Sequence, residues 1–192
     1  MKKDLLIIGF VLLLAVLLCR GVRIQSVEDY YLTHADDITP DSQTVTLSIS
    51  CASILEHWEN LDEELRKGGY VPEDGVLLEK KQYVLRPEDT VFSILVRAAK
   101  NEQIPIEYQG SQENAYGSAY IQGIQYIYEF SCGPLSGWMY RVNGEFPKKG
   151  CSQYVLKDGD EIEWIYTCDL GRDISTDLSF QKGQGSPSDQ GR

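Results

Sequence analysis

The strongest structural signals in this chain lie in SGWMYRVNGEFPKKGCSQYVLKDGDEIEWIYTC, residues 136–168. Trp138, Tyr140 and Val142 alternate with Met139 and Arg141, which is the period of a β-strand. Asn143-Gly144 follows, and this dipeptide suits the two positive φ angles of a type I′ turn. We therefore expect a β-hairpin whose return strand begins at Glu145 and loses its pairing at Pro147, which has no backbone N–H.

A second strand signal closes this stretch. Asp158-Gly159 forms a tight turn, and beyond it the apolar residues Ile162, Trp164 and Tyr166 alternate with polar ones. The segment after the turn is therefore predicted to be a half-buried strand, with Trp164 and Trp138 in the core. Outward contact is predicted instead for Met139, Arg141, Asn143 and Gln153.

The preceding part of the chain alternates between strand and helix patterns. TVTLSISC, residues 44–51, has the period of a strand, and residues 52–67 have apolar side chains at helical spacing that stop at Gly68-Gly69. A longer helix begins at Thr90, beside two carboxylates that favour a helix N-terminus, and ends near Lys100-Asn101. The remaining strand predictions are residues 76–85, as a strand pair or one long bent strand, and residues 104–108, 119–124 and 126–130.

These elements predict an α+β fold: a β-grasp-like mixed sheet with one main helix and an extra short helix after the first strand. The segment KDGDEIEW resembles the closing strand of β-grasp domains. Together with IEYQGS, GSAYIQGI and SGWMYRVNG, it resembles the C-terminal β-domain of the vitamin B12 carriers transcobalamin and intrinsic factor, and a bacterial family of exported domains of unknown function (DUF4430-like). The resemblance covers residues 44–169, and the helical α-barrel that makes up most of a B12 carrier has no counterpart here.

The resemblance implies a ligand-binding surface. In the B12 carriers this β-domain closes over the corrinoid with the hairpin region, which implies ligand-binding roles for Tyr120, Gln122, Trp138, Tyr140 and Gln153. Cobalamin or another corrinoid is then a candidate ligand, with no certain cofactor. We therefore expect a non-enzymatic module that binds a soluble small ligand, and the alternative is a surface module that docks proteins or glycans. A concave, tyrosine-lined pocket beside the hairpin would favour the first.

Charge and motif content argue against other classes of function. The formal net charge of −11 repels polyanions, so nucleic acid is not an expected partner. Neither His34 nor His57 has a Ser or Cys partner in a recognisable motif, so we do not expect an enzyme. The carboxylates around Asp158 lack the ligand spacing of an EF-hand and are predicted to be a turn and a solvated strand face.

The two ends of the chain differ from its middle. Residues 1–21 have two lysines followed by an uncharged apolar run, which fits a signal peptide or a membrane anchor. Residues 22–43 are predicted to be an acidic spacer, residues 44–169 the domain, and residues 170–192 a disordered polar tail. We therefore expect an exported protein that is secreted or held at the extracellular face of the membrane by an uncleaved N-terminal segment.

Four cysteines follow the N-terminal segment: Cys51, Cys132, Cys151 and Cys168. Their even number in an exported protein predicts two disulfides, whereas a metal site is not expected because no C-x-x-C pair occurs. The first and last strands of a β-grasp sheet are parallel neighbours, which favours pairing of Cys51 with Cys168. Cys132 and Cys151 flank the predicted hairpin, so we pair them with each other.

Overall fold

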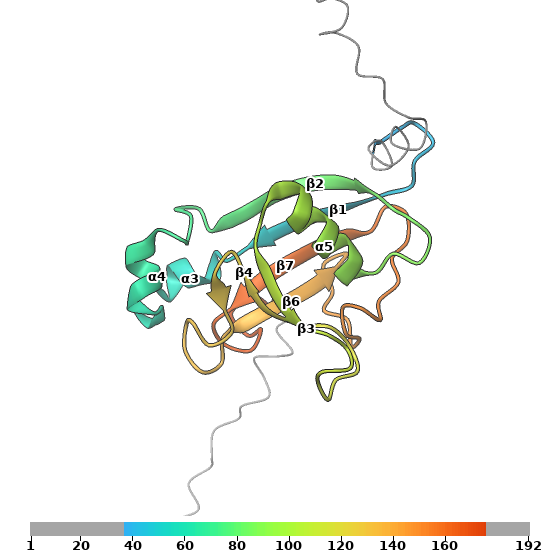
Figure 1. Ribbon diagram of the computed structural model, residues 1–192. Helices are drawn as coiled ribbons and strands as arrows, with labels where there is room; N and C mark the ends of the chain where they lie inside the picture. The colour runs from blue at the N-terminus through green and yellow to red at the C-terminus, as the bar shows by residue number, and fades with distance from the viewer. Residues whose placement is uncertain (1–36, 176–192) are drawn as a thin grey trace, which may run out of the picture. The chain divides into compact units, whose positions relative to one another are not determined.

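The first and last strands, β1 (Thr44–Ser50) and β7 (Glu161–Thr167), run parallel at the centre of a four-stranded sheet in the computed structural model, which describes residues 37–175 (Figure 1). The sheet order is β2-β1-β7-β6, and both outer strands, β2 (Val76–Val84) and β6 (Gly137–Val142), are antiparallel to their neighbours. The predicted α+β class with a mixed sheet is confirmed. The 76–85 segment is one long strand, with register shifts opposite β1.

The main helix, α5 (Val91–Glu102), begins where the sequence predicts. Thr90 caps it: its side chain accepts a hydrogen bond from the Ser93 N–H, and the Ser93 hydroxyl accepts one from the Thr90 N–H in return. The buried face of the helix repeats at helical spacing, with an ion pair between Arg97 and Asp89 at its edge. Its buried residues are Val91, Ile94, Leu95, Ala98 and Ala99.

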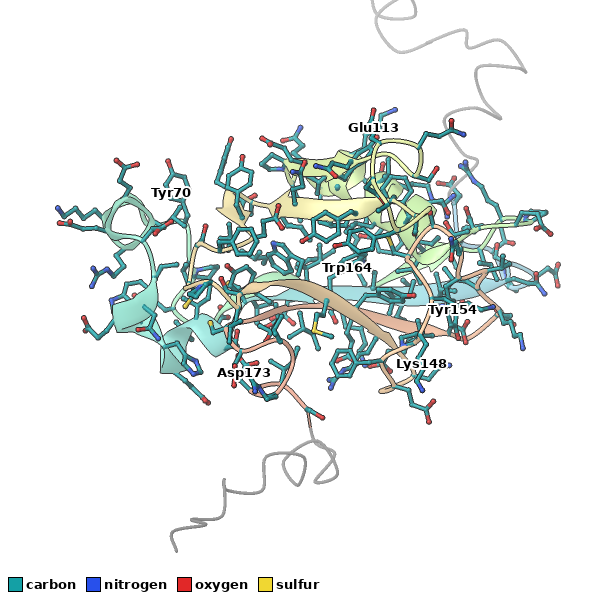
Figure 2. All side chains as sticks on the ribbon, turned by 90° about the horizontal axis from the view of Figure 1, so that it is seen from below. Tyr70, Glu113, Lys148, Tyr154, Trp164 and Asp173 are labelled. Atoms are coloured by element: carbon teal, nitrogen blue, oxygen red, sulfur yellow. The ribbon has the colours of Figure 1, made fainter. Side chains whose placement is uncertain are left out.

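A second, three-stranded sheet has the order β3-β4-β5 and consists of β3 (Ile106–Gln109), β4 (Tyr120–Ile124) and β5 (Ile127–Tyr128). The strand predicted at residues 126–130 is only two residues long, because Tyr126 and Phe130 have positive φ angles and bend the chain. Figures 1 and 2 show this small sheet and α5 on the same face of the four-stranded sheet. The core lies between these two layers, and Trp164 points into it (Figure 2).

The single helix predicted for residues 52–67 is wrong. The structure has three short pieces there: α3 (Ser53–Glu56), a 3-10 turn (Trp58–Asn60) and α4 (Glu63–Gly68). Leu61 interrupts the helix in an extended conformation with its side chain buried, and the Asp62 N–H donates to the Ser131 carbonyl at 2.9 Å. A contact with a distant segment thus overrides the local helical pattern.

The predicted hairpin is half correct. Asn143 and Gly144 have φ angles of 53° and 80°, as a type I′ turn requires. However, Glu145 makes only an isolated bridge to Val142, and no return strand follows. The full antiparallel partner of β6 is β7, which follows a connection of irregular structure. The turn was readable from local residues, but the strand that pairs with β6 was not.

The folded part continues beyond residue 169, where the sequence predicts the tail to begin. Asp173 accepts a hydrogen bond from the Cys168 N–H at 2.7 Å and another from the Thr167 hydroxyl. The expectations for residues 1–21, for most of the 22–43 spacer and for residues 176–192 lie outside the described residues. Among the described residues, no helix is both long and apolar enough to cross a membrane.

Candidate functional site

An aromatic cavity of about 530 Å³ opens between the two layers, beside β6. Five rings line it: Tyr116, Tyr120, Trp138, Tyr140 and Trp164. Strand geometry explains this gathering, because side chains two residues apart on a strand share a face and directly opposed residues on paired strands are neighbours. Trp138 and Tyr140 are two apart on β6, and Trp164 is the β7 partner of Tyr140 in the register. We call this space the aromatic cavity.

The structure brings four of the five predicted ligand-binding residues to the aromatic cavity: Tyr120, Trp138, Tyr140 and Gln153. Gln122 is not among the lining residues, although it lies on the same strand as Tyr120. Lys148 is the one charged side chain among the described lining residues, and it was not predicted because no strand or helix pattern marks its position. Trp164 was predicted to be core and is both buried and part of the cavity wall.

Two of the residues predicted to face outward make contacts within the protein instead of presenting free groups. Arg141 forms two hydrogen bonds with the Glu163 carboxylate on the neighbouring strand, at 2.5 and 2.7 Å. Asn143 donates to Asp160 at 2.9 Å and accepts from the Glu161 N–H at 2.9 Å. These contacts hold both side chains against the sheet and its turns.

Most hydroxyl and amide groups of the cavity are fixed by the protein. Tyr140 donates its hydroxyl to the Lys149 carbonyl at 2.5 Å, Tyr120 donates to Glu129, and the Gln153 amide donates to the Gly117 carbonyl at 2.8 Å. Burial raises the pKa of both phenols, and for Tyr120 the hydrogen bond to Glu129 raises the pKa further. Both tyrosines are therefore neutral at physiological pH, and Lys148 is the charged group.

One buried polar group near the cavity has no partner among the described residues. Trp164 is 2% exposed, and its indole Nε1–H makes no hydrogen bond. Leaving such a donor unsatisfied costs about 1–3 kcal/mol. Buried polar groups without a partner are few in folded proteins, so this donor in a residue of the cavity wall calls for an explanation.

The four described cysteines are free thiols, so neither predicted disulfide is present. The Cys168 thiol lies 3.9 Å from the Ser53 hydroxyl and interacts with the thiol of Cys132, which is not its predicted partner. Cys151 lies instead at the aromatic cavity, where its thiol donates to the Ala119 carbonyl at 3.1 Å. The reason for pairing Cys132 with Cys151 no longer holds, because the hairpin that they were expected to clamp does not form. Burial raises the pKa of Cys151 to about 11 and that of Cys51 to about 12.

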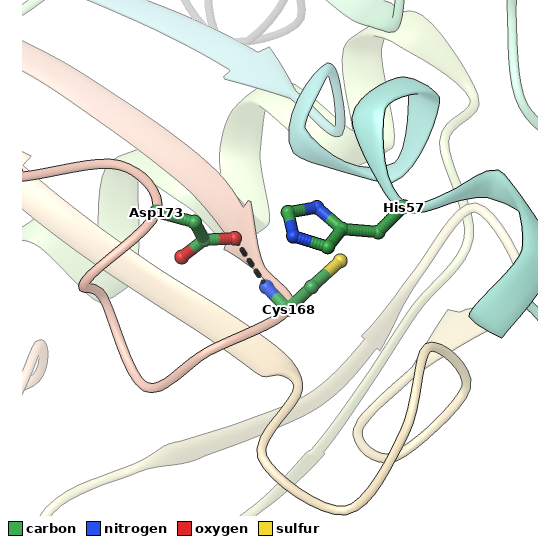
Figure 3. Close-up of side chains that lie close together, drawn as sticks. All are labelled: His57, Cys168 and Asp173. Atoms are coloured by element: carbon green, nitrogen blue, oxygen red, sulfur yellow. Dashed lines mark hydrogen bonds between the residues drawn. The ribbon is translucent and has the colours of Figure 1, made fainter.

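His57, Cys168 and Asp173 lie together at the end of β7 (Figure 3). The combination resembles the residue types of a cysteine hydrolase, but the hydrogen bonds do not follow that order. Nδ1 of His57 bonds the Ser53 carbonyl, and Asp173 bonds the backbone of Cys168 and the Thr167 side chain. Since the carboxylate does not orient the imidazole, this is not the arrangement that activates a thiol nucleophile.

Comparison with known proteins finds a family match in the central region. Residues 88–167 match the family described as Domain of unknown function (DUF4430), as the sequence predicts. No curated protein matches the sequence. Similar solved structures include haptocorrin in complex with Cbi, at 14% identity and a TM-score of 0.43, where 69% of this chain aligns with 27% of the haptocorrin chain. Another is a protein from Ruminococcus gnavus ATCC 29149 for which metal binding has been suggested, at 12% identity and a TM-score of 0.37, covering 65% of this chain and 96% of that one.

Proposed function

We propose that this chain, with its DUF4430 match over residues 88–167, is a non-enzymatic module that binds a small soluble ligand in the aromatic cavity. The observation that carries the proposal is the combination of five aromatic rings around about 530 Å³ with the unpaired indole N–H of Trp164. Small-molecule sites have this composition: mostly apolar walls, with a few polar groups that fix the orientation of the ligand.

The lining defines the chemistry of the ligand. Flat aromatic walls favour a planar apolar body, because such rings stack or meet edge to face. The N–H of Trp164 calls for a hydrogen-bond acceptor, and Lys148 favours an acceptor that carries negative charge or a strong dipole. The indole nitrogen has almost no accessible surface, so the acceptor reaches it only after the lining side chains shift. A corrinoid, which the sequence resemblance suggests, would offer its amide side chains as acceptors.

We further propose that the module works outside the cytoplasm. The support is the sequence of residues 1–21, two lysines followed by an apolar run, which is typical of an export signal or an anchor. Protease added to intact producing cells should digest the folded domain when it is anchored, and the domain should be found in the medium when it is secreted. Protection from protease together with absence from the medium would contradict export.

Titration of the full chain tests the ligand-binding proposal. The probes are cobinamide, cobalamin and a set of planar aromatic carboxylates, followed by calorimetry and by tryptophan fluorescence, because two of the three tryptophans line the cavity. We expect saturable binding of at least one probe, a raised melting temperature, and loss of binding in Tyr140→Ala. The control is Tyr126→Ala, which removes an exposed ring that is not part of the lining. Binding that survives in Tyr140→Ala, or no binding by any probe, contradicts the proposal.

A second candidate function, glycan binding, rests on a separate hollow of about 640 Å³ beside α4. Tyr70 and Tyr126 are both exposed and their ring centroids are 5.3 Å apart, with the acidic residues Asp62, Glu63 and Glu64 also in the lining. Exposed rings next to carboxylates suit a sugar, whose CH faces pack on rings while its hydroxyls donate to oxygens. Binding to a glycan array that is lost in Tyr126→Ala but kept in Tyr140→Ala would favour this function.

A further inference from the structure

Four metal-ligating side chains gather at one edge of the main sheet, and the topology explains why. Strands β1 and β7 are parallel neighbours, so their carboxyl ends lie at the same edge. The chain that leaves β1 carries His57, and the chain that leaves β7 carries Cys168 and Asp173. Strand β6 is antiparallel to β7, with Gly137 opposite Thr167, so the segment before β6 brings Cys132 to this edge too.

Three of the four donor atoms are already close enough to converge on one ion. One ligand atom from each of His57, Cys168 and Asp173 lies within 4.8 Å of the other two. Cys132 adds a second sulfur beside this group, because its thiol donates to the His57 carbonyl at 3.6 Å. Cys168 is 9% exposed and Cys132 is 2% exposed, whereas His57 and Asp173 are only half-buried, which leaves a route for an ion from solvent.

The surrounding hydrogen bonds orient the ligands. Nδ1 of His57 lies 2.9 Å from the Ser53 carbonyl oxygen. A carbonyl oxygen only accepts, so Nδ1 carries the hydrogen and Nε2 presents its lone pair. Figure 3 shows this far side of the ring turned toward Asp173 and Cys168. Histidines that bind metals are held in this way, by donation of the other ring N–H to a carbonyl or carboxylate.

Asp173 is held equally firmly. Its carboxylate accepts from the Cys168 N–H and from the Thr167 hydroxyl, so the acidic side chain lies against the residue that supplies a sulfur. Ionised carboxyl oxygens have more than one lone pair, so each can accept a hydrogen bond and still ligate. The bonds restrict where the carboxylate can sit without using up its capacity to bind an ion.

We propose that His57, Cys132, Cys168 and Asp173 form a binding site for a divalent transition metal of the zinc class. Two thiols, an imidazole and a carboxylate are a zinc donor set, and four such ligands complete a tetrahedron. Calcium and magnesium are disfavoured because they take oxygen ligands rather than sulfur. The sequence argument against a metal site relied on the missing C-x-x-C pair, but here the fold assembles the ligands from three distant segments.

Titration of the reduced full chain with Co²⁺, in metal-free buffer, tests the site. We expect one Co²⁺ per chain, with sulfur-to-cobalt charge-transfer absorption and the intense visible bands of a four-coordinate ion, and displacement of Co²⁺ by Zn²⁺. Both His57→Ala and Cys168→Ser should weaken Zn²⁺ binding at least about tenfold. Cys132→Ser should lower the charge-transfer intensity without abolishing it. Asp173→Asn, which keeps the size of the side chain, should weaken binding even if another variant fails to fold.

The matched control is Cys151→Ser, which removes a buried thiol from the aromatic cavity. It should leave the Co²⁺ spectrum and the Zn²⁺ affinity unchanged. Cobalt bound without charge-transfer absorption, or Zn²⁺ affinity unaffected by His57→Ala and Cys168→Ser, would overturn the proposal. A Cys132–Cys168 disulfide in protein isolated from producing cells without reductant would also overturn it, because neither sulfur could then ligate.

Discussion

Tyr140 on β6 and Trp164 on β7 are directly opposed in the antiparallel register, and their ring centroids lie 5.5 Å apart. The pair connects the sheet to the aromatic cavity: the same cross-strand contact that stabilises the β6–β7 pairing also forms a wall of the cavity. A molecule that contacts these rings would therefore contact β7, the central strand that pairs in parallel with β1.

Trp164→Phe should cost little stability for so large a buried side chain. Phe removes the unsatisfied N–H, which returns about 1–3 kcal/mol, and its smaller ring leaves a void that costs a similar amount. Trp164→Ala should instead lose about 3–5 kcal/mol. Urea unfolding of the three proteins measures both differences. A Phe variant as unstable as the Ala variant would mean that the unpaired indole N–H does not destabilise the folded protein.

The ion pair between Asp89 and Arg97 should be expensive to break from one side. The two charged groups are 2.8 Å apart, with side-chain exposures of 9% and 12%, and the Asp89 carboxylate also accepts from the Arg86 N–H and the Ser93 hydroxyl. Asp89→Ala removes the carboxylate that faces the buried guanidinium of Arg97, so we expect a loss of about 3–5 kcal/mol. The charge pair of Lys67 and Glu63 is a control on the surface, where Glu63→Ala should change stability by less than about 1 kcal/mol.

Asn143→Ala should destabilise the turn more than Asn143→Gly. Both variants lose the side-chain bonds to Asp160 and to the Glu161 N–H. Only Ala also has the strain of a positive φ, here 53°, which Gly adopts freely. We expect Ala to cost about 1 kcal/mol more than Gly. Equal losses in thermal unfolding would show that the side-chain bonds alone determine the contribution of Asn143.

Stability should fall with rising pH through the titration of Cys151. Burial raises the pKa of this thiol from 9.0 to about 11, so between these values the unfolded chain has lost a proton that the folded chain retains. The unfolded state then binds fewer protons, and the free energy of unfolding decreases by up to about 3 kcal/mol over this window. Cys151→Ser lacks this contribution. Urea unfolding of both proteins from about pH 8 to about pH 11 measures the difference between their free energies of unfolding, which should change with pH. A difference that stays constant over this range would contradict the prediction.

Local sequence patterns predicted the elements that depend on local physics. The helix at Thr90 and the strands β1 and β7 follow from side-chain periodicity and a capping residue, and the turn at Asn143 follows from its tolerance of positive φ. The errors at Leu61 and in the predicted hairpin involve partners distant in sequence. Leu61 breaks a helix because its neighbour Asp62 bonds Ser131, and no pattern around residue 61 reveals that contact.

The candidate sites divide in the same way. The resemblance to a known domain pointed to Tyr140 and three other residues that do line one cavity, whereas Lys148 lies in an irregular connection that periodicity does not describe. The cluster around His57 was missed because His57 and Cys168 are more than a hundred positions apart. They meet because β1 and β7 are parallel neighbours, so the segments that follow these two strands begin at the same edge of the sheet.

That parallel pairing also determines how the domain responds to mechanical force. β1 begins at Thr44 and β7 ends at Thr167, so these two points lie at opposite ends of the paired strands. The parallel pairing with β7 extends from Thr46 to Ser50 of β1. A pull between the two ends of the domain therefore slides β1 along β7 and loads their hydrogen bonds all at once, rather than opening them one after another. Because these bonds would have to break together, we expect the domain to resist stretching more strongly than a hairpin whose bonds open in sequence.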